Sequence, residues 1–135
     1  MYKIIELTEE QSEELDEALE EFDTEYITYR MEGSICLGIQ KDGELIAGVN
    51  SCVTCFKILY IETLFVQEEY RRTGLGKKLI TELEKRAKEM GVNLIRVDTF
   101  DWQGKDFYEA LGYRCVGSYD NAEDGYSEYF FMKRI

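Results

Sequence analysis

Apolar and polar positions along the chain change between strand-like and helical spacing several times. Residues 2–7, YKIIEL, predict a short first strand. Residues 8–22 predict a helix, because Thr8 is a suitable N-cap and acidic residues fill the first turn. The apolar stripe that this helix is expected to bury consists of Leu15, Leu19 and Phe22. Residues 26–32, YITYRME, predict a second short helix.

The middle of the chain predicts a hairpin, a central strand and a long helix. Asp42-Gly43 is a strong turn signal between two apolar runs, so residues 34–54 read as a hairpin. Residues 57–66, KILYIETLFV, are apolar on both faces, as expected for a central strand. Apolar residues at helical spacing then run to Met90, and Gly91 ends the helix.

The last third of the chain predicts a strand, a short helix and two further strands. Their ranges are residues 93–100, 104–113, 113–119 and 126–135. The chain has no linker, repeat or low-complexity segment. We therefore expect one α/β domain over residues 1–135 with a mixed sheet.

Composition narrows the class of protein. A chain of 135 residues with 44% hydrophobic content can bury one core. Its apolar runs, such as LFV and YFFM, are far shorter than the roughly 20 residues of a membrane span, and its N-terminus turns acidic at once, unlike a signal peptide. Sparse cysteines in strand-like sequence predict buried free thiols in a cytoplasmic protein: Cys36, Cys52, Cys55 and Cys115. No membrane partner is expected.

Two residue types are missing from the chain. It has no proline and no histidine, which excludes Ser-His and Cys-His nucleophilic pairs and histidine metal ligands. Cys52 and Cys55 have CxxC spacing, but no second pair completes a zinc site, and residues three apart in a strand point to opposite faces. We expect no metal.

Charge is unevenly distributed. The formal net charge is -12 with a pI near 4.5, which argues against nucleic acid as a partner. Residues 1–35 hold twelve acids and two bases, whereas residues 71–88 hold seven bases. Most of these side chains are expected to be solvated on helix faces.

The basic stretch YRRTGLGKKL, residues 70–79, lies between the central strand and the long helix. Free N–H groups and the helix dipole make such a turn an anion site. Gly74 and Gly76 allow a ligand to approach the backbone, while Arg71, Arg72 and Lys77 balance phosphate charge. The stretch matches neither a P-loop nor a dinucleotide fingerprint. A pyrophosphate is the predicted ligand.

Residues 71–76, RRTGLG, match the R/Q-x-x-G-x-G/A signature of the GCN5-related N-acetyltransferases (GNAT). LFV at 64–66 and FYEALGY at 107–113 stand where that family has its other hallmarks. The chain resembles the family along nearly its whole length. The resemblance implies a mixed, mostly antiparallel twisted sheet flanked by about four helices, and a transferase that uses acetyl-CoA as its donor.

The resemblance also implies roles for particular residues. The turn would bind the pyrophosphate of CoA through Arg71, Arg72, Thr73, Gly74, Leu75, Gly76 and Lys77. The fourth and fifth strands of the family part, and pantetheine would pair with Leu64, Phe65 and Val66. Tyr108 would lie beside the CoA sulfur. Many relatives carry Asn-x-x-Ala-x-x-Phe-Tyr, but this chain has Asp101 at the Asn position, and Gln103 is the candidate for a comparable amide contact.

Acetyl transfer to an amine needs a base for the ammonium and an acid for the departing thiolate. Glu62 is the candidate base, directly or through water, because it is the only carboxylate in the central strand and burial would raise its pKa. A salt-bridge partner is the alternative. Tyr108 is the candidate acid, or else a core tyrosine, and the N–H near Val66 is the candidate oxyanion donor. Tyr60, Asp98 and Tyr126 are candidates to line the acceptor pocket or are structural.

The acceptor is expected to be a small, cationic primary amine, because acids in the first two predicted helices would attract it. The alternative is that these acids only keep the protein soluble. A non-catalytic CoA-binding or protein-interaction module with this fold is the alternative function. An acidic interaction protein, such as an antitoxin or a DNA mimic, is a third. A homodimer through residues 126–135 is possible by analogy.

Overall fold

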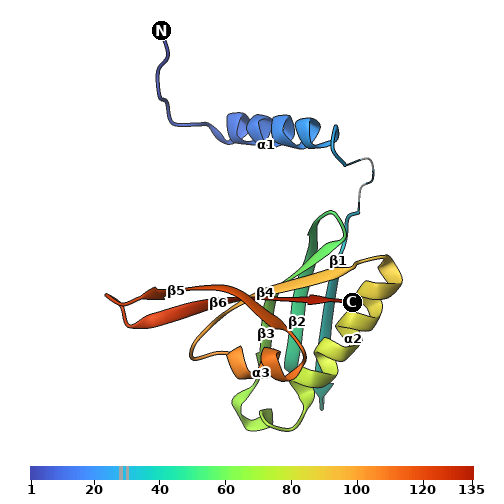
Figure 1. Cartoon of the computed structure of the whole chain (residues 1–135). Helices are drawn as coiled ribbons and strands as arrows, with labels where there is room; N and C mark the ends of the chain where they lie inside the picture. The colour runs from blue at the N-terminus through green and yellow to red at the C-terminus, as the bar shows by residue number, and fades with distance from the viewer. Residues whose placement is uncertain (28, 30) are drawn as a thin grey trace. The chain divides into compact units, whose positions relative to one another are not determined.

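The computed structural model describes residues 1–27, 29 and 31–135, except the side chain of residue 55. The chain divides into two compact units, residues 1–30 and 31–135 (Figure 1). Within the described part, no helix is long and apolar enough to cross a membrane. The single domain over residues 1–135 stays a prediction.

Among the described residues of the first unit there is one helix, α1 (Glu9–Asp23). Thr8 caps it as predicted, because its hydroxyl accepts from the N–H of Gln11 while the Gln11 side chain accepts from the N–H of Thr8. No described residue of the first unit covers the apolar stripe of this helix, Leu15, Leu19 and Phe22. Its burial against the rest of the chain stays a prediction.

Two predicted elements at the beginning of the chain are absent from the described residues. Residues 2–7 form no strand, because they pair with none of the described strands and a lone strand leaves its backbone groups unpaired. The described residues between 26 and 32 are not helical, and Thr28 and Arg30 lie outside the described residues.

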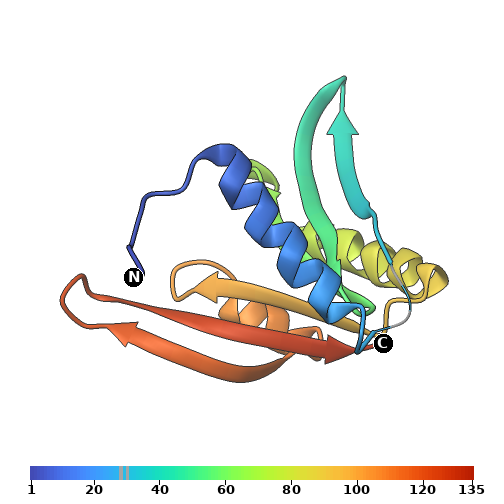
Figure 2. The same ribbon diagram turned by 90° about the horizontal axis from the view of Figure 1, so that it is seen from above.

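The second unit is built on a six-stranded sheet in the order β1-β2-β3-β4-β6-β5. Only β3 and β4 are parallel neighbours, and the other pairs are antiparallel. The hairpins β1–β2 and β5–β6 diverge from each other (Figure 2). The strands are β1 (Ser34–Lys41), β2 (Glu44–Cys55), β3 (Ile58–Val66), β4 (Leu94–Phe100), β5 (Arg114–Asn121) and β6 (Tyr126–Arg134).

The predicted strands and helices of this unit are confirmed. The β1–β2 turn has positive φ at Asp42 (52°) and Gly43 (80°), as a two-residue hairpin of this twist requires. A short 3-10 turn, η1 (Glu68–Tyr70), leads into α2 (Leu75–Met90), which ends at Gly91 with φ 101°. The third α-helix is α3 (Lys105–Ala110). The described chain therefore has three α-helices rather than about four.

One core joins both helices of this unit to the sheet. The buried residues of α2, including Leu83 and Ala87, share a cluster with Ile95 and Val97 of β4, and Tyr108 of α3 belongs to the same cluster. Both helices therefore cover the same face. Side chains alternate along β4, so Arg96, Asp98 and Phe100 lie on the opposite face. This opposite side, which also carries Cys52, Tyr60 and Glu128, is called the second face below.

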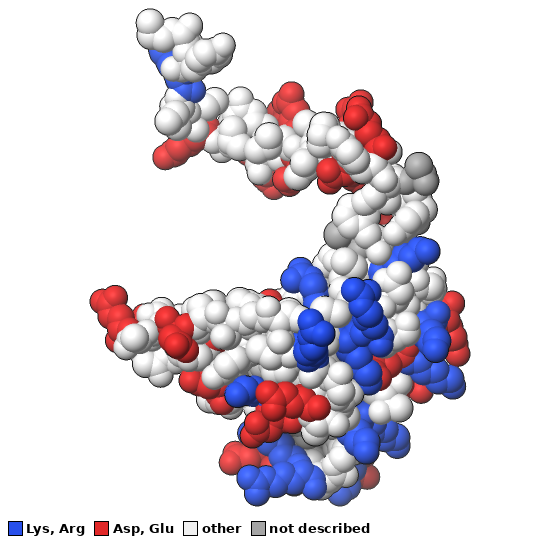
Figure 3. Space-filling view, in the orientation of Figure 1, with Lys and Arg blue, Asp and Glu red and all other residues white. Residues whose placement is uncertain are grey.

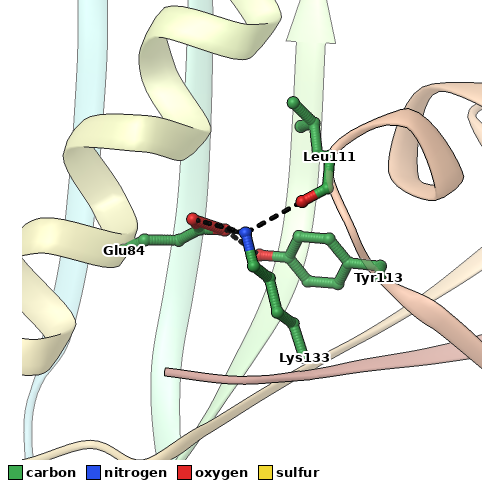
Figure 4. Close-up of polar contacts among 4 residues, drawn as sticks. All are labelled: Glu84, Leu111, Tyr113 and Lys133. Atoms are coloured by element: carbon green, nitrogen blue, oxygen red, sulfur yellow. Dashed lines mark hydrogen bonds and ion pairs between the residues drawn. The ribbon is translucent and has the colours of Figure 1, made fainter.

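A polar network ties α2 to the end of α3 and to β6 (Figure 4). The Lys133 ammonium donates to both carboxylate oxygens of Glu84, at 3.0 and 3.2 Å, and to the carbonyl of Leu111 at 2.8 Å. The Tyr113 hydroxyl donates to Glu84 at 2.9 Å. Burial, and then the Glu84 carboxylate, raises the pKa of Tyr113. Each group is paired, so the network fixes the position of α3.

Glu84→Ala should lower the free energy of unfolding by about 2–3 kcal/mol, because it leaves a partly buried ammonium and a hydroxyl without their acceptor. Glu82→Ala is the matched control, since it removes the exposed Glu82–Arg86 pair of the same helix, whose side chains are 43% and 53% exposed. The control should cost less than about 0.5 kcal/mol. Urea unfolding of both variants measures the difference, and equal losses would contradict the assigned role of the network.

Candidate active site

The parallel strands β3 and β4 part halfway along their length. They pair from Ile58 to Ile61 of β3 and from Leu94 to Val97 of β4, and no further. β3 nevertheless continues to Val66 and β4 to Phe100. Beyond Ile61, the β3 edge that faces β4 has no strand partner among the described residues. An extended ligand could pair with that edge.

A β-bulge marks the point of parting. Asn50 of β2 lies opposite Thr63 and Ser51 lies opposite Ile61, so Glu62 is an extra residue in β3. Glu62 is exposed, which contradicts the expected burial. Burial of the Cys52 thiol raises its pKa, and a hydrogen bond to the Glu62 carboxylate raises it further. A protonated thiol is a poor nucleophile, so Cys52 favours no covalent intermediate.

The backbone of Val66 faces the unpaired edge of β3. Neighbouring peptide groups in a strand point to opposite edges. The N–H of Gln67 donates to Ile46 in β2 at 2.9 Å, so the N–H and C=O of Val66 point the other way. The Val66 carbonyl accepts from Nε of Arg71 at 2.8 Å, and the Arg71 guanidinium lies 5.3 Å from the centre of the Phe65 ring. Two of the predicted cofactor residues, Arg71 and Phe65, therefore contact each other.

The turn before α2 presents unpaired backbone N–H groups. Gly74 is the N-cap with φ 86°, and no side chain caps the helix. Nothing in the described part of the chain lies within 4 Å of a Cβ placed on Gly74, so the space beside it is open. Arg72 also has a positive φ, 63°, which is uncommon for a residue with a side chain. Arg71, Arg72, Thr73 and Lys77 are exposed around this turn.

Gly76 has a packing role that the sequence did not reveal. A Cβ on Gly76 would lie 3.1 and 3.2 Å from two ring atoms of Phe107. The absence of a side chain therefore lets α3 approach the first turn of α2. The glycine was predicted to admit a ligand, and the structure adds a contact between the two helices that carry the predicted site.

Tyr108 is almost fully buried, at 4% exposure, against Tyr113 and Phe131. Burial raises its pKa well above that of an ordinary tyrosine. No described residue forms a hydrogen bond with its hydroxyl. Every fully buried polar side-chain atom of the described residues does have a hydrogen-bond partner. The hydroxyl must therefore reach solvent while the ring is held in the core.

Gln103 braces the turn between β4 and α3. Its side-chain carbonyl accepts from the N–H of Phe100 at 2.9 Å. A contact with pantetheine would therefore have to come from its amide nitrogen. The N–H of Gly104 donates to the buried hydroxyl of Thr99 at 2.9 Å, which holds the same turn against β4.

Charged and aromatic side chains meet on the second face where β3 and β4 part. The Tyr60 hydroxyl donates to Asp98 at 2.9 Å, and the Arg96 guanidinium lies 4.5 Å from the Tyr60 ring centre. Burial raises the pKa of Tyr60, and so do the carboxylates of Asp98 and Glu128. A hollow of about 390 Å³ lies over β1–β3, where Gly38 and Gly48 face each other and Phe65 forms part of the lining.

The three described cysteine side chains are free thiols. Cys36 and Cys115 are exposed and Cys52 is half-buried, so the expected burial is wrong for the first two. In Figure 3, acidic side chains mark α1, and basic side chains occur on the second unit, including its lower end where the turn before α2 lies.

The sequence model of the acetyltransferase (GNAT) family matches residues 1–113. The chain belongs to this family. It is also 33% identical to blasticidin-S acetyltransferase of Streptomyces morookaense over 94 residues, which cover 69% of this chain and 68% of the relative. A crystal structure of an acetyltransferase from Bacillus cereus is 30% identical, with a TM-score of 0.92 over 99% of this chain and 98% of that one.

A third similarity shows the fold alone. The crystal structure of an aminoglycoside 6'-N-acetyltransferase complexed with coenzyme A is 21% identical, with a TM-score of 0.66 over 75% of this chain and 72% of that one. The predicted family and fold class are thus confirmed, and this GNAT protein is an acetyltransferase.

Gly76→Ala should destabilise the acetyltransferase by about 1–3 kcal/mol, because the new methyl group overlaps the Phe107 ring. Phe107→Leu removes the ring edge, so the double variant should lose less than the sum of the two single losses. Urea unfolding of the four proteins gives the coupling free energy. Strict additivity would contradict the helix contact as the reason for this glycine.

Proposed function

We propose that this GNAT protein transfers an acetyl group from acetyl-CoA directly to a primary amine of a small, cationic acceptor. The observation that carries the proposal is the parting of β3 and β4 beside an uncapped, glycine-started helix. Acetyl-CoA matches these two features, because its pantetheine arm suits the unpaired strand edge and its pyrophosphate suits the uncapped helix start. The relatives are named for acetylation of blasticidin S and of aminoglycosides, and the latter structure contains coenzyme A.

In this proposal the turn before α2 holds the cofactor phosphates. The free N–H groups that follow Gly74 donate to the pyrophosphate, and Arg72 and Lys77 balance its charge. The pantetheine arm lies along Leu64, Phe65 and Val66 and pairs with the edge of β3 that β4 has left. The N–H of Val66 then donates to the thioester oxygen as negative charge develops on it.

Proton transfer is assigned to Glu62 and Tyr108. Glu62 sits at the bulge, where its exposed carboxylate can accept a proton from the acceptor ammonium, directly or through water. The neutral amine attacks the thioester carbon, its nitrogen then loses a second proton to solvent water, and the carbon–sulfur bond breaks as CoA leaves. Tyr108 gives its proton to the thiolate, and its raised pKa keeps it protonated through neutral pH. No covalent enzyme intermediate is needed.

Calorimetric titration with acetyl-CoA tests the cofactor site. Wild-type protein should bind acetyl-CoA, and Gly74→Glu should abolish binding, because a carboxylate would occupy the place of the phosphates. Gly125→Glu is the matched control: Gly125 has a similar φ of 78° and open space beside it, so the variant adds the same charge and similar strain elsewhere. Loss of binding in both variants, or no binding by the wild type, would contradict the proposal and favour a module without cofactor chemistry.

Tyr108→Phe should lower kcat by about 100-fold if the phenol is the general acid. A raised pKa moves loss of the phenol proton to higher pH, so wild-type kcat should show no alkaline decline from Tyr108 below about pH 10. Thiol release measured from pH 6 to 10 checks both points. Tyr26→Phe, at an exposed tyrosine of the first unit, should keep wild-type kcat. An alkaline decline near pH 8 that disappears in Tyr108→Phe would contradict the raised pKa that follows from the burial of Tyr108.

A further inference from the structure

Three aromatic side chains form a corner at the end of β4, and the proposed chemistry leaves them unused. The rings of Phe100 and Trp102 are stacked, with centroids 4.8 Å apart and an angle of 2° between their planes. The Tyr126 ring meets both edge-on, at 5.5 and 5.8 Å. Phe100, Trp102 and Tyr126 are called the aromatic corner.

Trp102 is 65% exposed, although hydrogen bonds hold the backbone on both sides of it. The N–H of Asp101 donates to the Ser127 carbonyl and the N–H of Ser127 donates to the Asp101 carboxylate, both at 3.1 Å. The N–H of Gln103 donates to the carbonyl of Phe100, and the Gln103 side-chain carbonyl accepts from the N–H of Phe100. A large ring that is fixed in place and still faces solvent provides a binding surface with little ordering cost.

The corner lies on the second face, at the end of the strand that leaves β3. Phe100 follows the last parallel pair, Ile61 and Val97, by three residues, and α3 with Tyr108 begins soon after Trp102. Phe100 pairs with Glu128 across β4 and β6, and Asp98 precedes it on the same face. A ligand on Trp102 would therefore lie near these two carboxylates and near the proposed transfer site.

The charge and shape of this region select the ligand. The carboxylates of Asp98 and Glu128 favour a cation, whereas a stacked indole favours a planar group. A guanidinium group is both planar and positively charged, and it stacks on aromatic rings better than an ammonium does. Arg96 over Tyr60 already shows a guanidinium in this arrangement on the same face.

We propose that the aromatic corner binds a planar cationic group, such as a guanidinium, at the end of the acceptor that does not react. The assignment rests on the proposed function and narrows its acceptor to amines that also carry such a group. Binding there orients the reacting amine toward the gap between β3 and β4, so the corner acts on substrate affinity and not on proton transfer.

Three amines of similar length distinguish the effect of a planar group from the effect of a positive charge. At the end that does not react, agmatine carries a guanidinium, cadaverine a second ammonium, and pentylamine neither. Agmatine should have the lowest KM and pentylamine the highest. Trp102→Ala should raise the KM for agmatine about 3- to 30-fold at nearly unchanged kcat. The same substitution should leave the KM for pentylamine unchanged. Trp102→Phe should recover part of the loss. Phe56→Ala, at an exposed ring in the β2–β3 turn, should change none of these values.

A second readout does not depend on turnover. Trp102 is the only tryptophan of the chain, so its fluorescence reports on this corner alone. Agmatine should change that fluorescence with saturation, and pentylamine should not. Equal KM values for the three amines that Trp102→Ala does not change would overturn the inference about the corner. The proposed function would still stand in that case if the protein binds acetyl-CoA. If no amine is acetylated, saturable quenching by agmatine still supports the corner, and its absence overturns it.

Discussion

The parallel pairing of β3 with β4 stops after four residue pairs, and the arrangement of the rest of the site follows from that interruption. The bulge at Glu62 changes the register of β3 against β2, and β4 stays with β6 up to Phe100. A strand edge in the middle of the sheet is thereby left without its partner. Such an edge exposes unpaired N–H and C=O groups, which a folded protein normally covers. A ligand with amides along an extended arm would cover it, which is why the geometry favours a pantetheine cofactor.

An interrupted sheet needs other contacts to hold its two halves in place, and these contacts come from α2 and α3. Glu84 and Lys133 connect the middle of α2 to β6, and Lys133 also holds the carbonyl at the end of α3. At the other end of α2, the ring of Phe107 packs against Gly76. Tyr108 follows directly on Phe107, so its position depends on both contacts. The polar network and the glycine contact therefore fix the position of the proposed acid.

Elements with local chemical signals could be predicted from the sequence, and those that depend on distant partners could not. The Asp42-Gly43 turn and the cap of α1 are determined by residues within four positions of each other. The turn before α2 carries a recognisable sequence pattern for the same reason. By contrast, Tyr60 meets Asp98 from 38 positions away, and the bulge at Glu62 appears only in the register with β2. Residues 2–7 have the pattern of a strand, but a pattern cannot supply the neighbour that a strand needs.

The charge distribution suits two substrates of opposite sign. Residues 1–30 carry eleven acids and two bases, so they hold -9 of the net charge of -12. At physiological ionic strength, the field of a solvated charge falls off over about 8 Å, so anion binding at the turn before α2 depends mainly on its own arginines and free N–H groups. In the proposed function, short-range contacts would bind the cofactor phosphates, and the acids on the second face would attract the cationic acceptor. In the proposed reaction, the anionic donor and the cationic acceptor would approach different charged regions and meet where β3 and β4 part.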